Sequence, residues 1–189
     1  MIKIYSPAKV ANSIVKIAQS LDVNIDPLKI QKLLYFSHGW SLAINGRGLI
    51  NEPFHAWKFG PVLSSVYHEF KRYGNGAIKH FMSEIVQDKS NSKNVNLFWK
   101  TNFIPESDQE TLELLKHIIK KYAKFSAITL SHMTHLKKSP WHITYENGIK
   151  EGIKNGKEVP NKLIMQYFQK QQKTPAPELP VLSAADLAC

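Results

Sequence analysis

The chain is nearly free of cysteine and has no long apolar run. Its one cysteine is the last of the 189 residues, Cys189, so no disulfide can form within the chain. That usage agrees with a reducing, cytoplasmic location. No apolar run approaches the roughly 20 residues that a membrane-spanning helix needs, and the first residues lack the apolar core of a signal peptide. We therefore expect a cytoplasmic protein without a membrane partner.

Residue patterns of common enzyme classes are missing as well. The chain has no G-x-S-x-G nucleophile elbow, no G-x-G-x-x-G loop and no Walker-type loop, and its 15 carboxylates are scattered. The best metal candidates are His132 and His135, three residues apart on a predicted helix, with His142 nearby. No cysteine or acidic cluster completes a zinc ligand set. We expect a non-enzyme with no catalytic residues, cofactor or metal; a zinc hydrolase at these histidines is the weaker alternative.

Arginine is scarce although the chain is strongly basic. The formal net charge is +10, carried by 23 lysines and only two arginines, Arg47 and Arg72. Such charge favours an acidic partner, either a nucleic acid or an acidic protein surface, although genome composition explains a lysine-rich surface equally well. Base-specific DNA reading depends on the arginine fork, whereas lysine contacts phosphates as a point charge. Sequence-specific DNA binding is therefore poorly equipped here.

Residues 115–136 still allow a helix-turn-helix interpretation, with two predicted helices joined at residues 123–125. A small DNA-binding regulator of its own operon is thus the alternative function, although helical hairpins are far commoner than DNA readers. In that interpretation the second helix presents these side chains outward: Thr129, Ser131, His132 and Thr134.

Helix-start signals and apolar periodicity predict a mainly helical fold. Ser6-Pro7 and Asp26-Pro27 each combine an N-cap with a proline at the first helical position. They predict helices over residues 7–21 and 27–44, and the second is apolar nearly all round, as is typical of a central core helix. Further helices are predicted from Gly60-Pro61 to 73, from a capping box at 107–110 to 122, and over 126–136, 139–147 and 161–171.

The β structure is expected to be small. Short aromatic segments predict one or two strands over residues 49–59, and a hairpin is predicted within residues 75–105. The fold class is α+β, predominantly α-helical: a compact helical domain over residues 1–172 with a small antiparallel β element. Residues 173–189 are proline-rich and are expected to form a flexible tail.

Three motifs together resemble a known family. They are KIQKLLYF at residues 29–36, AWKFGPV at residues 56–62, and the pattern L-x-x-x-T-H-x-x-x-x-P-W over residues 130–141. A closing segment over residues 159–168 approximates a fourth family pattern. The chain resembles, over roughly residues 7–170, the Panacea, or SocA-like, antitoxin domain family, which also includes the phage-associated GepA.

This resemblance implies a mainly helical, cytoplasmic, non-enzymatic antitoxin that neutralises a toxin encoded beside it by direct binding. In at least one branch the antitoxin delivers its toxin to the ClpXP protease, which makes ClpXP a further expected partner. Residues 183–189 look like a ClpXP degradation tag, with an ordinary tail as the alternative. The expected toxin-binding edge, or its direct support, consists of Tyr35, Trp57, Phe59, Gly60 and Pro61.

Overall fold

The computed structural model describes residues 3–88, 96–153 and 156–173. The predicted tail from residue 174 onward, including the degradation-tag segment, lies outside these residues. The described part is a helical domain with two small antiparallel sheets, so the predicted α+β, mainly helical class is confirmed. Its helices are α1 (Pro7–Ser20), α2 (Pro27–Asn45), α3 (Ser64–Phe70), α4 (Gln109–Tyr122), α5 (Ala127–His135), α6 (Pro140–Lys150) and α7 (Asn161–Lys173). Its strands are β1 (His55–Trp57), β2 (Gly60–Val62), β3 (Glu84–Asp88), β4 (Asn96–Lys100) and β5 (Lys157–Glu158).

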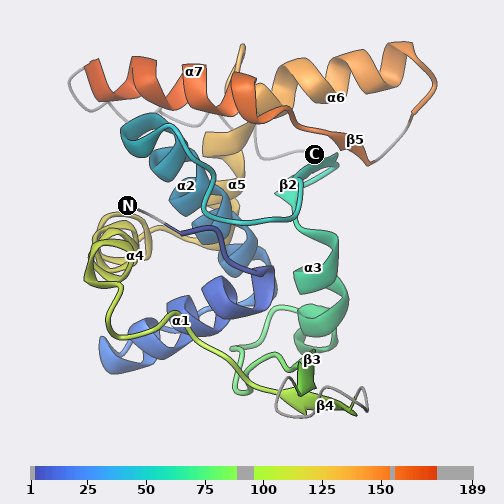
Figure 1. Cartoon of the computed structure of the whole chain (residues 1–189). Helices are drawn as coiled ribbons and strands as arrows, with labels where there is room; N and C mark the ends of the chain where they lie inside the picture. Colours follow the sequence, from blue (N-terminus) through green and yellow to red (C-terminus); the bar gives the residue numbers. More distant parts are fainter. Residues whose placement is uncertain (1–2, 89–95, 154–155, 174–189) are drawn as a thin grey trace.

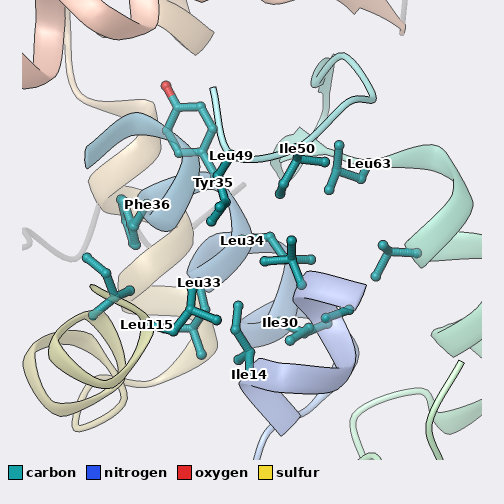
Figure 2. Close-up of a cluster of buried hydrophobic side chains, with 14 of the residues drawn as sticks. Ile14, Ile30, Leu33, Leu34, Tyr35, Phe36, Leu49, Ile50, Leu63 and Leu115 are labelled. Carbon is teal, nitrogen blue, oxygen red and sulfur yellow. The ribbon is translucent and has the colours of Figure 1, made fainter. Parts of the chain in front are cut away.

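Helix α2 lies at the centre of the fold, as its apolar sequence predicts. It packs against α1, α4, α5 and α7 and against the β2–α3 segment (Figure 1). Figure 2 shows its fully buried Ile30, Leu33 and Leu34 beside Ile14 of α1 and Leu115 of α4. Burying such side chains is the main source of the domain's stability, at about 25 cal/mol per Å² of apolar surface. No helix of the described residues is long and apolar enough to cross a membrane.

The predicted helix starts are confirmed at Ser6, Asp26 and Ser139, whose side chains accept backbone N–H groups as N-caps. The capping box expected from Ser107 is wrong by one residue. Asp108 is the N-cap of α4, and its carboxylate accepts the backbone N–H of Thr111 at 3.2 Å. Asp108 is favoured there because it also binds the Tyr5 hydroxyl, at 2.5 Å, and so ties α4 to the N-terminal segment.

Gly60-Pro61 does not begin a helix, contrary to the sequence prediction. The two residues belong to β2, where Ala56 pairs with Pro61 and Trp57 with Gly60, and α3 begins only at Ser64. The strand order β2-β1-β5 makes β2 an edge strand. A proline is tolerated there because its missing N–H costs no ladder hydrogen bond. Gly60 has φ +103°, a backbone conformation that side chains with a Cβ rarely adopt.

The predicted hairpin within residues 75–105 is confirmed as the antiparallel pair β3–β4, with Ile85 opposite Trp99 and Gln87 opposite Leu97. It projects from the base of α1 and α3, at the bottom of Figure 1. This second sheet is separate from the β2-β1-β5 sheet. The domain therefore carries two small β elements rather than one.

Candidate functional site

The tight turn between β1 and β2 is the point where the three sequence motifs meet. Helix α2 brings Lys32 to one side of the turn, and α5 brings Thr134 to the other. A Cβ built on Gly60 would lie 2.5 Å from Lys32 Nζ and 2.6 Å from Thr134 Oγ1. Any side chain at this position would therefore collide with both neighbours. The glycine of the second motif is required by residues of the first and third.

Four side chains bind four backbone carbonyls of residues 57–61, and we call this arrangement the carbonyl clamp. Trp141 Nε1 donates to the Trp57 carbonyl at 2.8 Å, and His135 Nε2 lies 3.1 Å from the Lys58 carbonyl. Ser131 Oγ donates to the Phe59 carbonyl at 2.9 Å, and Lys32 Nζ donates to the Pro61 carbonyl at 3.3 Å. The clamp fixes the main chain of the turn from α2, α5 and α6.

Lys32 is the most unusual member of the clamp because it is fully buried. Removing an ammonium from water disfavours its charged form. Burial accordingly lowers the pKa of Lys32 to about 7. An amine with that pKa carries its proton only part of the time near neutral pH, and its bond to the Pro61 carbonyl is one the neutral amine can also make.

His135 lies between two backbone carbonyls, and the neutral imidazole donates its single N–H to one of them. Its Nδ1 is 2.5 Å from the Ser131 carbonyl, in addition to the Nε2 contact with Lys58. Burial lowers the pKa of His135, the two carbonyls act in the opposite direction, and the nearby Lys32 adds to the lowering. The Trp141 ring lies against the imidazole with centroids 3.7 Å apart and stacks on Tyr145 at 4.7 Å. The clamp is thus backed by a packed aromatic group.

The clamp leaves the side chains of the turn facing outward. Phe59 is 57% exposed, and Lys58 is exposed with its Nζ 5.5 Å from the centre of the Phe59 ring. Trp57 is half-buried and meets Tyr67 of α3 edge-on, with ring centroids 4.8 Å apart. We call Trp57, Lys58, Phe59 and Tyr67 the aromatic tip. It is a fixed, partly apolar surface on a rigid support.

The predicted site residues divide between this tip and the interior. Trp57 and Phe59 are accessible, whereas Gly60 and Pro61 are buried and shape the turn from inside. Tyr35 lies in the core, 5.4 Å from the ring of Phe54 and away from the clamp. Its hydroxyl has no hydrogen-bond partner among the described residues. Tyr35 therefore packs in the core, and its expected role as a toxin contact or as the support of one stays a prediction.

Sequence reasoning missed the roles of Lys32, Ser131, His135 and Trp141 as ligands of the turn's carbonyls. The available signal was Lys32, which directly precedes the apolar residues 33–36 in the predicted core helix, since a charge inside a core helix needs a specific reason. The identity of a backbone acceptor leaves no trace in sequence. The other three assignments therefore needed the structure.

The geometry supports neither the zinc-site alternative nor the DNA-binding alternative. His132 and His135 have ring centroids 6.5 Å apart, while His142 faces Glu146 at 3.3 Å. Among the described residues, no group of three or more histidine, cysteine or acidic side chains is placed to hold a metal. The helix-turn-helix interpretation expected four α5 side chains to face outward toward DNA. This is wrong for two of them, because Ser131 and Thr134 are buried against the turn.

The described residues thus form a helical domain that fixes an exposed turn through its main chain. The family model described as "Antitoxin SocA-like, Panacea domain" matches residues 30–142, which include the whole clamp. The chain belongs to this family. Antitoxin SocA of Caulobacter vibrioides (strain NA1000 / CB15N) is 32% identical over 163 residues, which cover 86% of this chain and 82% of that protein. No solved structure gives a significant match.

Proposed function

We propose that this protein is an antitoxin that neutralises a cognate toxin by direct binding, with the aromatic tip as a contact surface. The relationship to Antitoxin SocA, which extends over most of both chains, carries the proposal.

The form of the tip supports its assignment as a contact surface. Aromatic side chains dominate binding hot spots because they bury large apolar areas at low entropic cost. Phe59 and Trp57 are such side chains, and the clamp holds their main chain before a partner arrives. Preorganisation of this kind lowers the entropy that is lost on binding. The net charge of +10 favours a toxin with an acidic face.

The test begins with the gene beside this one. Its product should stop growth when expressed alone, and co-expression of this protein should restore growth. Phe59→Ala should weaken binding to the purified toxin at least tenfold, which equals about 1.4 kcal/mol. The matched control is Ile44→Ala on α2, since Ile44 is 55% exposed and Phe59 57%. The control should bind like the parent chain, and both variants should melt like it.

Two results would contradict the proposal. A non-toxic neighbour that does not bind would remove the antitoxin role. Equal toxin affinity of the parent chain and Phe59→Ala would remove the tip from the interface while the role remained.

We further propose delivery of the bound toxin to the ClpXP protease as one route of neutralisation. Purified ClpXP should then degrade the toxin faster when this protein is added. If the toxin stays intact with both present, neutralisation proceeds by binding alone. The cytoplasmic location expected from cysteine usage stays a prediction.

DNA binding is not proposed as a second function. Two of the four α5 side chains expected to face DNA are buried against the β1–β2 turn instead. The sequence predicted no other DNA-reading helix among the described residues.

A further inference from the structure

The β3–β4 hairpin exposes an apolar surface that the core does not use. Ile85 is 56% exposed, Leu97 64% and Trp99 70%. Because Ile85 pairs with Trp99, and Leu97 is two residues from Trp99 on β4, all three side chains lie on the same face of the hairpin. Phe98, on the opposite face, is also exposed. An exposed apolar group of this kind in a folded domain marks an interaction site.

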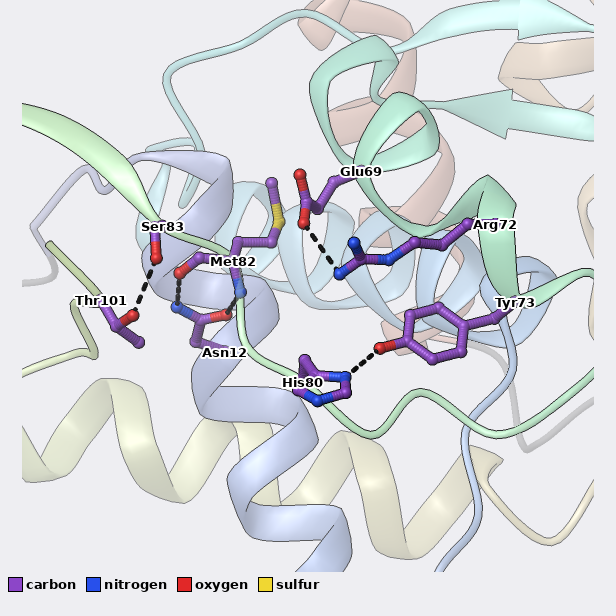
Figure 3. Close-up of polar contacts among 8 residues, drawn as sticks. All are labelled: Asn12, Glu69, Arg72, Tyr73, His80, Met82, Ser83 and Thr101. Atoms are coloured by element: carbon purple, nitrogen blue, oxygen red, sulfur yellow. Dashed lines mark hydrogen bonds and ion pairs between the residues drawn. The ribbon is translucent and has the colours of Figure 1, made fainter. Parts of the chain in front are cut away.

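The base of the hairpin is fixed by one buried amide. Asn12 of α1 is fully buried, and its Oδ1 accepts the Met82 N–H at 2.7 Å while its Nδ2 donates to the Met82 carbonyl at 2.9 Å (Figure 3). The same Nδ2 lies 2.9 Å from the carbonyl of Asn102, beyond the end of β4. Asn12 therefore ties both ends of the hairpin to α1.

Further polar contacts strengthen the same attachment. Ser83 and Thr101 join the two arms through their hydroxyls at 3.0 Å (Figure 3), and the Ile104 N–H donates to Ser13 Oγ at 2.9 Å. The Ser83–Thr101 contact is exposed, whereas the Asn12 and Ser13 contacts are buried, and burying polar groups is costly unless each is satisfied. The fold thus uses buried hydrogen bonds to hold out a hairpin that adds little to the core. Such an arrangement fits a presented binding element.

The hairpin also offers strand edges to a partner. In the described residues, β3 and β4 pair with each other in a two-stranded sheet, so the outer edge of β4 carries no third strand. Leu97, Phe98 and Trp99 are exposed in succession, which leaves both faces of β4 open. Natural proteins normally protect an apolar edge strand because it accepts further strands. A two-stranded sheet becomes more stable when a third strand is added.

The charge of the chain indicates which kind of partner could bind the open edge of β4. A second copy of this chain would bring another +10, and the two copies would repel each other at long range. Lys100 is exposed at the end of β4 opposite Glu84 of β3, and Lys16 Nζ lies 5.2 Å from the centre of the Phe103 ring near the base of the hairpin. Since Glu84 offsets Lys100 locally, it is the net charge of the whole chain that favours an acidic partner over a second copy. Apolar side chains must accompany the acidic ones to cover Leu97 and Trp99.

We propose that β4 accepts an extended, acidic and apolar segment of the toxin as an additional strand. Main-chain hydrogen bonds along β4 give affinity in this mode, and contacts with Ile85, Leu97 and Trp99 give selectivity. The inference rests on the proposed antitoxin function and adds a second contact to the aromatic tip. The toxin is recognised both by a fixed turn and by strand addition.

The test uses the full chain and the purified product of the neighbouring toxic gene. In Leu97→Thr/Trp99→Thr the strand-forming tendency is kept and the apolar face is lost. The toxin affinity should fall at least tenfold. The control variant Ile44→Thr/Ile149→Thr removes two side chains that are 55% and 56% exposed on α2 and α6, and its affinity should match the parent chain. Both double variants should keep the parent melting temperature.

Hydrogen exchange on the parent chain gives a second readout that needs no substitution. Backbone amides of β4 should become protected when the toxin binds, because strand addition engages the main chain. Raising the salt concentration should slow association, since the selecting charges are screened.

Each outcome decides between the proposals. Equal affinities of the parent and the hairpin variant, or unchanged exchange in β4, would overturn strand addition and leave the antitoxin role standing. A parent chain that does not bind the toxin would overturn both. If the parent sediments as a dimer and the hairpin variant as a monomer, the occupant is a second copy and the toxin assignment is wrong.

Discussion

Replacing the buried Lys32 by methionine should stabilise the domain near neutral pH. The lysine is fully buried, and burial lowers its pKa from the ordinary value of 10.5 to about 7. One pKa unit corresponds to about 1.4 kcal/mol. The lowered pKa therefore represents a cost of folding on the order of 5 kcal/mol for an amine that is protonated in the unfolded chain. Methionine has a similar unbranched shape and carries no charge.

The variant also loses one favourable contact. Lys32 Nζ donates to the Pro61 carbonyl at 3.3 Å, and a buried acceptor without a donor costs roughly 1–3 kcal/mol. The difference leaves a net gain of a few kcal/mol at pH 7. We expect the unfolding free energy of Lys32→Met to exceed that of the parent chain by this amount.

The pH dependence provides the sharper criterion. Between pH 7 and pH 10.5 the unfolded chain holds the Lys32 proton and the folded chain has released it. Stability of the parent chain therefore rises with pH across this window, with a slope of at most about 1.4 kcal/mol per pH unit from this group. The advantage of Lys32→Met should shrink as the pH rises toward 10.

Urea unfolding followed by tryptophan fluorescence, repeated from pH 6 to 10, measures both quantities. Lys29→Met is the matched control, because Lys29 is half-buried one turn earlier on α2 and its Nζ donates to the Ala123 carbonyl at 3.1 Å. The control should not produce the pH-dependent gain. Parallel stability curves for the parent and Lys32→Met would refute the reasoning, as would a loss of stability that is constant with pH.

Three further predictions concern other fixed points of the fold. Gly60→Ala should lower the unfolding free energy by about 2–3 kcal/mol, through backbone strain and the collision with Lys32. Urea unfolding measures this loss. The control Gly46→Ala has open space around the added methyl group and should cost less; equal losses would show that the close approach to Lys32 does not matter. Asn12→Ala should lower the unfolding free energy by about 2–4 kcal/mol, because Met82 and Asn102 lose a buried hydrogen-bond partner. It should also speed hydrogen exchange in β3 and β4. Unchanged exchange would mean that other contacts hold the hairpin. Burial raises the pKa of Asp108, but hydrogen bonds from Tyr5 and Thr111 hold this pKa below its ordinary value. The stability that Asp108 contributes is therefore present above the ordinary carboxyl pKa and is lost as the pH falls through the lower folded-state pKa. Asp108→Ala should flatten the acid side of a thermal-stability profile, and an unchanged profile would count against this assignment.

The helices could be predicted because their signals are local. Ser6 and Asp26 cap helices through their own side chains, and the apolar sequence of α2 by itself indicates a central position. Gly60-Pro61 was misassigned because a proline suits an edge strand as well as the first turn of a helix. Which of the two forms depends on β1, which is a neighbour in space.

The sites were harder to predict because their decisive contacts join distant segments. Asn12 is an ordinary polar residue in the sequence of α1, and only its contacts with Met82 and Asn102 identify it as the hairpin's anchor. Two of the four outward positions expected on α5, Ser131 and Thr134, are wrong for the same reason. Ser131 faces inward because the carbonyl of Phe59 lies there. Phe59, which the sequence also offers as a candidate, is exposed, and its role as a contact residue stays a prediction.

Because the carbonyl clamp binds main-chain oxygens, it places no demand on what residues 58 and 59 are. Every amino acid supplies the same carbonyl, so Lys58 and Phe59 can be exchanged while the supporting hydrogen bonds stay in place. The turn is therefore a fixed main-chain support whose exposed side chains can vary independently of it. If the aromatic tip contacts the toxin as proposed, exchange of these two residues would change specificity while the core stays the same.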